Sequence, residues 1–114
     1  MELNCQKLFD KQVALESVGD DAELLKDIAA LFSREYKDSL SALANAIQSQ
    51  NRGLIESTAH SLRSTIGYFG SELASSTALR LELLGRSGDL ADASNLFMEL
   101  EQILTLLSAE LAKI

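Results

Sequence analysis

The sequence predicts an all-α protein, an antiparallel up-down-up-down four-helix bundle with a short N-terminal helix packed on it. The 114 residues include no proline and few aromatic residues, and this composition, rich in leucine, alanine and glutamate, suits long helices and not strands. Apolar residues also recur at helical spacing in segments that only short polar turns separate, and short connections make neighbouring helices antiparallel. A chain of this length has room for one core, so we expect a single domain over residues 1–114.

A short helix is predicted over residues 10–18. Phe9 and Val13 form its apolar face, with Leu8 and Ala14 as further candidates, and Gly19 ends the helix as a left-handed cap. A helix of this length is not stable alone, so we expect it to pack on the bundle.

A long helix is predicted over residues 20–49. Asp20 serves as its N-cap, and Glu23 completes a capping box three residues later. Tyr36 keeps the apolar register through a polar middle, which favours one helix of roughly 40 Å; a break at residues 33–39 is the alternative. The other apolar positions are Leu24, Ile28, Leu31, Phe32, Leu40, Leu43 and Ile47.

Three further helices complete the predicted bundle. The third starts at Asn51, the fourth near Ser71, and the fifth at an Asp89 cap that follows a turn at residues 85–89. Each helix carries one apolar stripe. The stripe positions are Ile55, Ala59, Leu62, Ile66 and Phe69 in the third helix, Leu73, Thr77, Leu81 and Leu84 in the fourth, and Leu90, Ala93, Leu96, Phe97, Leu100, Ile103, Leu104, Leu107 and Leu111 in the fifth.

The charge is distributed unevenly along the chain. The net charge is −7, and so strongly acidic a protein lacks the basic field that nucleic acids and anionic membranes attract, so we expect neither as a partner. Residues 51–86, however, carry four arginines against three glutamates. This locally basic segment is a candidate docking site for an anionic group or an acidic protein.

Cys5 is the single cysteine, so it can form neither an intramolecular disulfide nor a metal or redox pair with a second thiol. The first residues contain no apolar signal region, and no stretch approaches the roughly 18 apolar residues of a membrane span. We therefore expect a cytoplasmic protein, and a monomer.

His60 is the only histidine, and it lies on the polar face of the third predicted helix. At about 100° per residue it points roughly 160° away from Leu62, the centre of the apolar stripe. Its own face is nearly free of large side chains, and the two glycines there each cost about 1 kcal/mol relative to alanine inside a helix. A bare face of this kind indicates steric access for a bulky partner. The residues on it or at its edge are Gly53, Glu56, Ser57, Arg63, Ser64, Gly67 and Ser71.

The imidazole of His60 suits phosphoryl transfer. An ordinary histidine has a pKa near 6.5, which leaves a large neutral, nucleophilic fraction at cytosolic pH. Arg63, one turn along the helix, is placed to pair with three anionic oxygens. A carboxylate on an adjacent helix would select the attacking nitrogen by fixing the tautomer.

Other interpretations of His60 are weaker. A lone histidine on a polar helix face is most often ordinary solvated surface. Glu56 and His60 do not make a metal site, because a carboxylate di-metal bundle needs Glu-x-x-His pairs on two helices. A serine hydrolase is excluded, because the sequence has no strand-turn-helix elbow around a nucleophile. We expect no metal and no cofactor on this chain.

The segment around His60 resembles the histidine phosphotransfer (HPt) motif, whose usual form is AHxLKGxxxxxG. It reads Ala59-His60-Ser61-Leu62-Arg63-Ser64-Thr65-Ile66-Gly67-Tyr68-Phe69-Gly70 and shares the histidine, the leucine and the final glycine. The resemblance extends over nearly the whole chain, through Phe9-Asp10, Ala14-Leu15, Gly19-Asp20, Glu23-Leu24-Leu25 and Leu81-Glu82-Leu83-Leu84-Gly85-Arg86-Ser87-Gly88-Asp89-Leu90.

The resemblance implies a four-helix bundle that relays phosphoryl groups between receiver domains in two-component signalling, with a sensor or hybrid histidine kinase as a further partner. By position, His60 is the phosphorylated residue and Arg63 stands where the family usually has lysine. Glu82 takes the place of the Gln or Glu that orients the imidazole, and Arg86 matches a basic residue near the site. Mg²⁺ is expected on the partner receiver only. No autokinase activity is expected, because the chain has no glycine-rich nucleotide loop.

Ser64 departs from the family motif, which has glycine where the receiver must approach His60. Because serine is still small, we expect a competent site with altered partner preference. Arg63 keeps the charge of the usual lysine but changes its reach and geometry. The competing hypothesis is an interaction module of the same fold that binds receiver or kinase domains without being phosphorylated. Retention of His60 and Glu82 favours the phosphocarrier.

Overall fold

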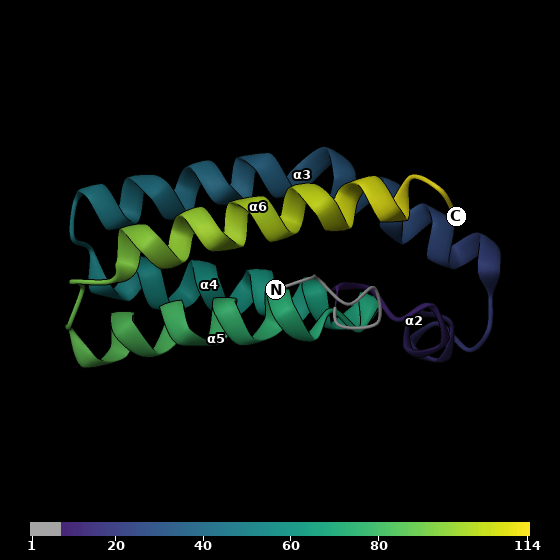
Figure 1. Cartoon of the computed structure of the whole chain (residues 1–114), viewed down its shortest axis with the longest axis horizontal. Coiled ribbons are helices and arrows are strands. Elements are labelled where there is room, and N and C mark those ends of the chain that lie inside the picture. Colours follow the sequence, from purple (N-terminus) through teal and green to yellow (C-terminus); the bar gives the residue numbers. More distant parts are fainter. Residues whose placement is uncertain (1–7) are drawn as a thin grey trace.

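The computed structural model describes residues 8–114, in which five α-helices and one short 3-10 helix are arranged as a bundle (Figure 1). Four long helices form a closed ring in which α3 packs on α4, α4 on α5, α5 on α6 and α6 on α3. The predicted up-down-up-down four-helix bundle is therefore confirmed. The bounds are α2 (Lys11–Ser17), α3 (Ala22–Gln48), α4 (Arg52–Ile66), η1 (Gly67–Phe69), α5 (Glu72–Ser87) and α6 (Ala93–Leu111).

The short helix α2 packs at one end of the bundle, against η1 and α3. Asp10 caps it by accepting hydrogen bonds from the backbone N–H groups of Gln12 and Val13. The N–H of Asp10 in turn donates to the carbonyl of Phe69 at 3.1 Å. These bonds confirm the predicted N-terminal helix and attach it to the segment that follows α4. The prediction that Val13 lies on its apolar face is wrong, because Ala14 is the buried residue of α2 and Val13 is 41% exposed.

The end of α2 agrees with the predicted left-handed cap. Gly19 has φ +63°. Its N–H donates to the backbone carbonyl of Glu16, and the N–H of Asp20 donates to the carbonyl of Leu15. This pair of bonds is a Schellman turn, in which Asp20 is the second residue after the cap. Asp20 also has φ +63°, so it belongs to the end of α2.

The prediction that Asp20 caps the long helix is wrong by one residue. Because Asp20 closes the preceding turn, Asp21 is the N-cap of α3 and accepts from the N–H of Leu24 at 3.0 Å. Glu23 is then the second helical residue and not the third that a capping box requires. Its charge still lies in the first turn, where the helix dipole favours an anion.

The long helix α3 is continuous, so the alternative of a break at residues 33–39 is wrong. Tyr36 is buried and stacks on Phe32 with ring centroids 5.2 Å apart. Phe32 also meets the edge of Phe69 from η1 at 5.3 Å. This aromatic cluster gives the polar middle of α3 the apolar packing that keeps it helical.

The turn before the last helix lies later than predicted. Gly85 is inside α5, and the left-handed residue that ends this helix is Gly88, with φ +85°. Asp89 is not the cap of α6, because its carboxylate accepts from Ala91 in a local turn. The cap position belongs to Asp92, whose carbonyl accepts the first helical bond, from Leu96.

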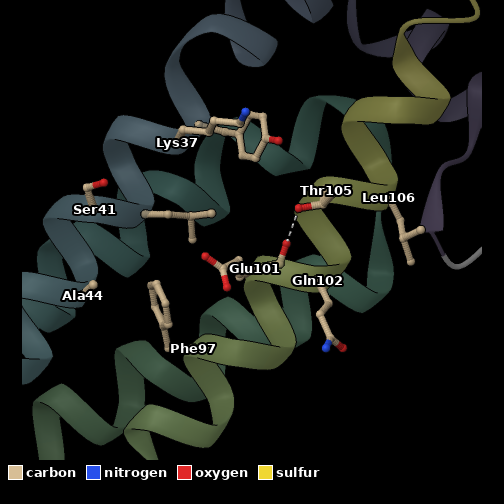
Figure 2. A pocket seen from close by; sticks show the side chains of 10 residues that line it. Lys37, Ser41, Ala44, Phe97, Glu101, Gln102, Thr105 and Leu106 are labelled. Carbon is tan, nitrogen blue, oxygen red and sulfur yellow. Dashed lines mark hydrogen bonds between the residues drawn. The ribbon is translucent and has the colours of Figure 1, made fainter.

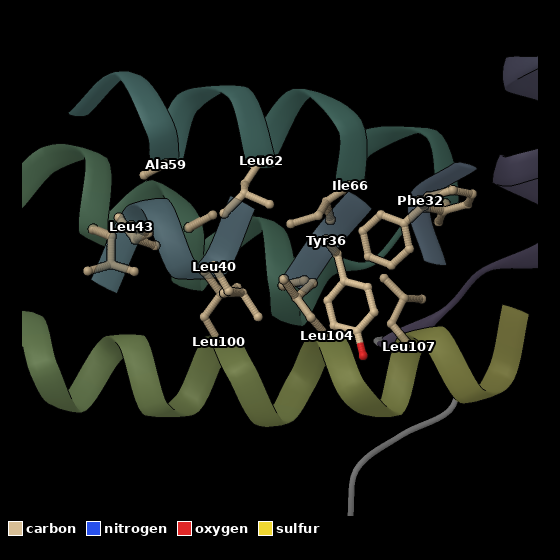
Figure 3. Close-up of a cluster of buried hydrophobic side chains, with 14 of the residues drawn as sticks. Phe32, Tyr36, Leu40, Leu43, Ala59, Leu62, Ile66, Leu100, Leu104 and Leu107 are labelled. Carbon is tan, nitrogen blue, oxygen red and sulfur yellow. The ribbon is translucent and has the colours of Figure 1, made fainter. Parts of the chain in front are cut away.

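The core confirms the predicted stripes of α4 and α6 and most of that of α3, and their side chains point towards one another (Figure 3). The prediction is wrong for Leu24 and Leu31, which are 43% and 45% exposed, because the buried face of α3 is centred on their neighbours Leu25, Ala29 and Phe32. In α5 the buried side differs from the prediction, because Leu73 and Leu84 are only partly buried. Small residues of α5 take the deeper positions, among them Ala74, Ala78 and Gly85. This helix can therefore lie closer to its neighbours than leucines would allow.

Within residues 8–114, no helix has both the length and the apolar character that a membrane span needs. Cys5, for which the sequence predicts no disulfide or metal pair, lies outside the described range.

Candidate functional site

His60 lies midway along α4 on the outer surface of the bundle. Its side chain is 58% exposed, whereas Leu62 on the opposite side of the helix is buried. The helix begins where the sequence predicted, at Asn51, whose side chain caps α4 by accepting from the backbone N–H of Leu54 at 3.2 Å. The predicted outward orientation of His60 is therefore what the structure shows.

The partner of His60 is Glu82 on α5. Nδ1 of the imidazole is hydrogen-bonded to Oε1 of Glu82, whose side chain is only 3% exposed. Burial raises the pKa of Glu82, but the hydrogen bond from His60 and the charge of Arg63 outweigh burial and hold the pKa below its ordinary value. Glu82 is thus ionised at neutral pH.

The ionised carboxylate determines the tautomer of a neutral His60. A carboxylate can only accept hydrogen bonds, so Nδ1 must carry the proton. The other nitrogen, Nε2, then holds the lone pair. The arrangement leaves one nucleophilic nitrogen on an exposed ring.

Arg63 is the third member of this cluster. Its Nη2 atom donates to Oε2 of Glu82 at 3.0 Å and approaches Nδ1 of His60 at 3.4 Å. Nε of Arg63 is buried without a partner among the described residues. The sequence predicted that Arg63 lies near His60, but not that its guanidinium is engaged with Glu82.

Gly85 explains how α5 brings Glu82 within reach of α4. A Cβ atom on Gly85 would lie 2.8 Å from the backbone nitrogen of Glu56 and 2.9 Å from the carbonyl of Arg52, so the two helices meet backbone to backbone. The side chain of Arg52 also donates to the carbonyl of Gly85 at 3.2 Å and to that of Arg86 at 2.7 Å. It thereby binds the carbonyl end of α5.

Neither of these supporting contacts was predicted from the sequence. Gly85 was expected in a turn, and Arg52 was expected only as one of the four arginines of the locally basic segment. The role of Gly85 could have been inferred from its position three residues after Glu82, which places both residues on one face of the helix. Nothing in the sequence alone pairs Arg52 with α5.

Four of the residues predicted to share the face of His60 are exposed on the surface. Gly53, Ser57, Ser64 and Gly67 are exposed. A Cβ atom on Gly67 would meet nothing within 4 Å, and one on Gly53 would meet only the Asn51 side chain at 3.8 Å. Neither glycine has a positive φ. Internal packing therefore does not require glycine at either position.

The hydroxyl of Ser64 is turned towards its own helix. Oγ donates to the backbone carbonyl of His60 at 3.1 Å, as serine often does inside helices. The side chain that replaces the glycine of the motif therefore adds little bulk beside the ring.

Two predicted docking residues pair with each other. Nε of Arg86 donates to Oε2 of Glu56 at 2.8 Å, and this hydrogen bond raises the pKa of Arg86 above its ordinary value. Both side chains lie one turn away from the His60 cluster along their helices. They form a charged pair at its edge.

The prediction that Ser71 shares the face of His60 is wrong. Ser71 is 1% exposed, and its hydroxyl caps α5 by accepting from Ala74. The helical projection from His60 fails here because α4 ends at Ile66 and the chain reverses at Gly70, which has φ +63°.

Two exposed leucines extend the surface beside the cluster. Leu79, Leu83 and Arg86 follow one stripe of α5 at the spacing of a single helix face, and Arg86 reaches Glu56 on α4. Both leucines are exposed. Sequence reasoning did not select them, because apolar residues at helical spacing normally indicate the core.

A large hollow lies away from this cluster, between α3 and α6 (Figure 2). It encloses about 830 Å³ and combines apolar side chains such as Phe97 with charged ones such as Lys37 and Glu101. It contains none of the residues around His60. This hollow is therefore separate from the His60 cluster on the exposed face of α4 and α5.

Comparisons with known proteins agree on one family. The Hpt domain family model matches residues 27–110. Histidine-containing phosphotransfer protein B (HptB) from Pseudomonas aeruginosa PAO1 is similar in structure, with a TM-score of 0.85 and 20% identity over 92% of this chain and 91% of that one. The HPT domain of an Hpt sensor hybrid histidine kinase from Shewanella has a TM-score of 0.81 and 14% identity over 95% and 93%. Among curated proteins, no sequence matches.

Proposed function

We propose that this chain, which the match over residues 27–110 shows to belong to the Hpt domain family, accepts a phosphoryl group on Nε2 of His60. The group comes from the aspartyl phosphate of a receiver domain and passes to the aspartate of another receiver. Hpt domains are phosphocarriers of two-component phosphorelays and interact with histidine kinases and receiver domains. A general role in phosphotransfer thus follows from membership. The residues and the direction of transfer are our proposal.

The observation that carries the proposal is the bond between exposed His60 and buried Glu82. In the reaction, the lone pair of Nε2 attacks the phosphorus of the aspartyl phosphate in line, through a loose transition state. The bond between phosphorus and the carboxyl oxygen breaks, and the aspartate leaves with the electron pair. The imidazole, which keeps its Nδ1 proton, becomes positively charged, and the carboxylate of Glu82 stabilises that charge.

The bare face around His60 supports the approach of a receiver. Gly53 and Gly67 are not needed for packing, although glycine costs about 1 kcal/mol relative to alanine in a helix interior. A partner whose aspartyl phosphate must reach Nε2 supplies a reason for both. The exposed Leu79 and Leu83 add an apolar border to the surface that the receiver would cover.

This chain contributes little to the chemistry beyond orientation and access. We propose that it uses no metal or cofactor of its own, and that the Mg²⁺ of the receiver offsets the phosphoryl charge during transfer. No autokinase activity is proposed. A module that only bound receivers would have no use for a carboxylate that orients the imidazole.

Labelling by a phosphorylated receiver tests the proposal. The protein should take up one phosphoryl group per chain in an acid-labile, base-stable form, as expected for a phosphohistidine. His60→Gln should abolish labelling and leave the helical circular dichroism signal unchanged, because the side chain is exposed. Labelling of His60→Gln at the parental rate would show that another residue is the acceptor, and absence of labelling in the parent would favour the pure interaction module.

A further inference from the structure

Arg63 lies on the Nδ1 side of the His60 ring, away from the nitrogen that the proposed transfer uses. Its Nη2 atom is 3.4 Å from Nδ1 and 3.0 Å from Oε2 of Glu82. The exocyclic bonds of Nδ1 and Nε2 point away from the ring in different directions. A phosphoryl group on Nε2 would therefore extend away from the guanidinium in this arrangement.

Glu82 is the group in this cluster that needs a cation. Its carboxylate is almost fully buried, with Oε1 bound to His60 and Oε2 bound to Arg63. A buried carboxylate without a compensating charge tends to take up a proton. The protonated form would carry an O–H donor of its own.

The protonation state of Glu82 decides which ring nitrogen is free. An ionised Glu82 accepts the Nδ1 proton of His60 and leaves the lone pair on Nε2. A protonated Glu82 would donate to Nδ1 and move the ring proton to Nε2, where it would block attack on phosphorus. The cation beside Glu82 thus controls the nucleophile without touching it.

We propose that Arg63 is a positioning residue that acts through Glu82, holding it as the acceptor that keeps the proton of His60 on Nδ1 and the lone pair on Nε2. This inference rests on the proposed role of His60 as the phosphoryl acceptor. It differs from the expectation, drawn from the sequence, that Arg63 pairs with the phosphoryl oxygens. Here Arg63 and Glu82 form one unit of opposite charges that supports the imidazole.

The tautomer of His60 can be measured directly, without any receiver. The protein is enriched with ¹⁵N and studied by NMR at a pH where the ring is neutral. Because the chain has a single histidine, the spectrum shows one pair of ring nitrogens. The parent should show the proton on Nδ1. Arg63→Gln should shift the population towards the Nε2 proton, and Arg63→Lys, which restores the charge, should keep it on Nδ1.

Arg80→Gln is the matched control. It removes the same charge from an exposed arginine of α5 that borders a hollow next to α6, and it should leave the tautomer unchanged. Circular dichroism and thermal melting establish that each variant is folded. A parental tautomer in folded Arg63→Gln, or a loss of the Nδ1 proton in Arg63→Lys, would overturn the proposal.

A double-mutant cycle on the transfer rate separates action through Glu82 from direct contact with phosphate. Glu82→Gln supplies an amide oxygen that accepts from Nδ1 and needs no cation. In the parent, Arg63→Gln should slow phosphoryl labelling by roughly tenfold, at the lower end of what losing an orienting partner costs. In the Glu82→Gln background, the same change should slow labelling by less than about twofold. Equal slowing in both backgrounds would indicate that Arg63 contacts the phosphoryl group directly, and it would refute the proposal. Labelling that survives His60→Gln would instead refute the proposed function, while the tautomer results would stand.

Discussion

His60 and Glu82 differ greatly in exposure although their side chains are in contact. The imidazole must be exposed to meet a partner, whereas the carboxylate that orients it is more effective when buried, because a charged hydrogen bond is stronger away from water. The arrangement is possible because Arg63 compensates the buried charge. His60 was selected from the sequence as the only histidine, on a bare helix face, whereas Glu82 was selected only through the family resemblance.

Ser64 provides a test of access at the residue scale. Ser64→Leu keeps the helix but places a bulky side chain beside the ring, so labelling by every receiver should be blocked. Ser64→Gly should leave transfer from the cognate receiver nearly unchanged. It should speed transfer from non-cognate receivers, because we expect even the small serine side chain to exclude them sterically. Both effects are measured as initial labelling rates.

Ser94→Leu is the control for this pair, because Ser94 is an exposed serine near the start of α6. It should be labelled at the parental rate. All three variants should melt close to the parent, since exposed substitutions usually change stability by less than about 0.5 kcal/mol. If Ser64→Leu is labelled as fast as the parent, the face around His60 is not a docking surface.

At the scale of the elements, the site depends on how closely α4 and α5 pack. Gly85 allows the backbone of α5 to meet that of α4, and Glu82 lies one turn before this contact. Leu84 on the same helix is only partly buried. The geometry of the His60–Glu82 bond is thus a consequence of a glycine that takes no part in the chemistry.

Substitution of two glycines by alanine should have opposite effects. Gly85→Ala places a Cβ atom 2.8 Å from a backbone nitrogen, so the helices must separate, at a cost of about 1–3 kcal/mol, and labelling should slow as Glu82 moves away from His60. Gly67→Ala meets nothing within 4 Å and should stabilise the fold by about 0.4–1 kcal/mol. Urea unfolding measures both changes, and equal stability of the two variants would contradict the close contact.

At the scale of the whole molecule, the bundle has two unlike halves. The α4–α5 pair lies within the locally basic segment of the sequence and carries His60, the exposed leucines and the bare glycines. The α3–α6 pair supplies a hollow with charges of both signs (Figure 2). An anionic aspartyl phosphate is therefore expected to approach the side of the molecule where acidic charge is lowest.

The stability of the whole fold should respond to acid partly through Glu82. Its pKa is lowered from the ordinary value of 4.5, so its contribution to the free energy of unfolding is fully present above that value and is lost as the pH falls through the lower pKa of the folded state. Glu82→Gln has no such group to protonate, so its free energy of unfolding should fall less than that of the parent over this acid range. Urea unfolding at pH 7 and at several values below 4.5 measures the difference.

Glu99→Gln is the control, because it removes an exposed carboxylate from α6. The parent and Glu99→Gln should lose stability in parallel below the ordinary pKa of Glu82. A Glu82→Gln curve parallel to theirs would mean that Glu82 is not held ionised by its neighbours.

Within residues 8–114, the sequence by itself determined the order and approximate extent of the five α-helices, because apolar spacing and turn residues are local properties of the chain. Its errors at the helix ends were small and local. Asp20 and Asp89 are each followed within three residues by another aspartate, and which one caps the helix depends on the geometry of the preceding turn. Ser71 was misplaced because a helical projection cannot include the reversal at Gly70.

Only the tertiary structure decided how the side chains of α4 and α5 meet. The engagement of Arg63 with Glu82, the approach permitted by Gly85 and the attachment of Arg52 to the end of α5 all join residues more than fifteen positions apart. Such contacts depend on the separation and rotation of two helices, which are set by the packing of the entire core. A sequence pattern indicates which face of each helix is apolar, but it does not determine the distance between two packed helices.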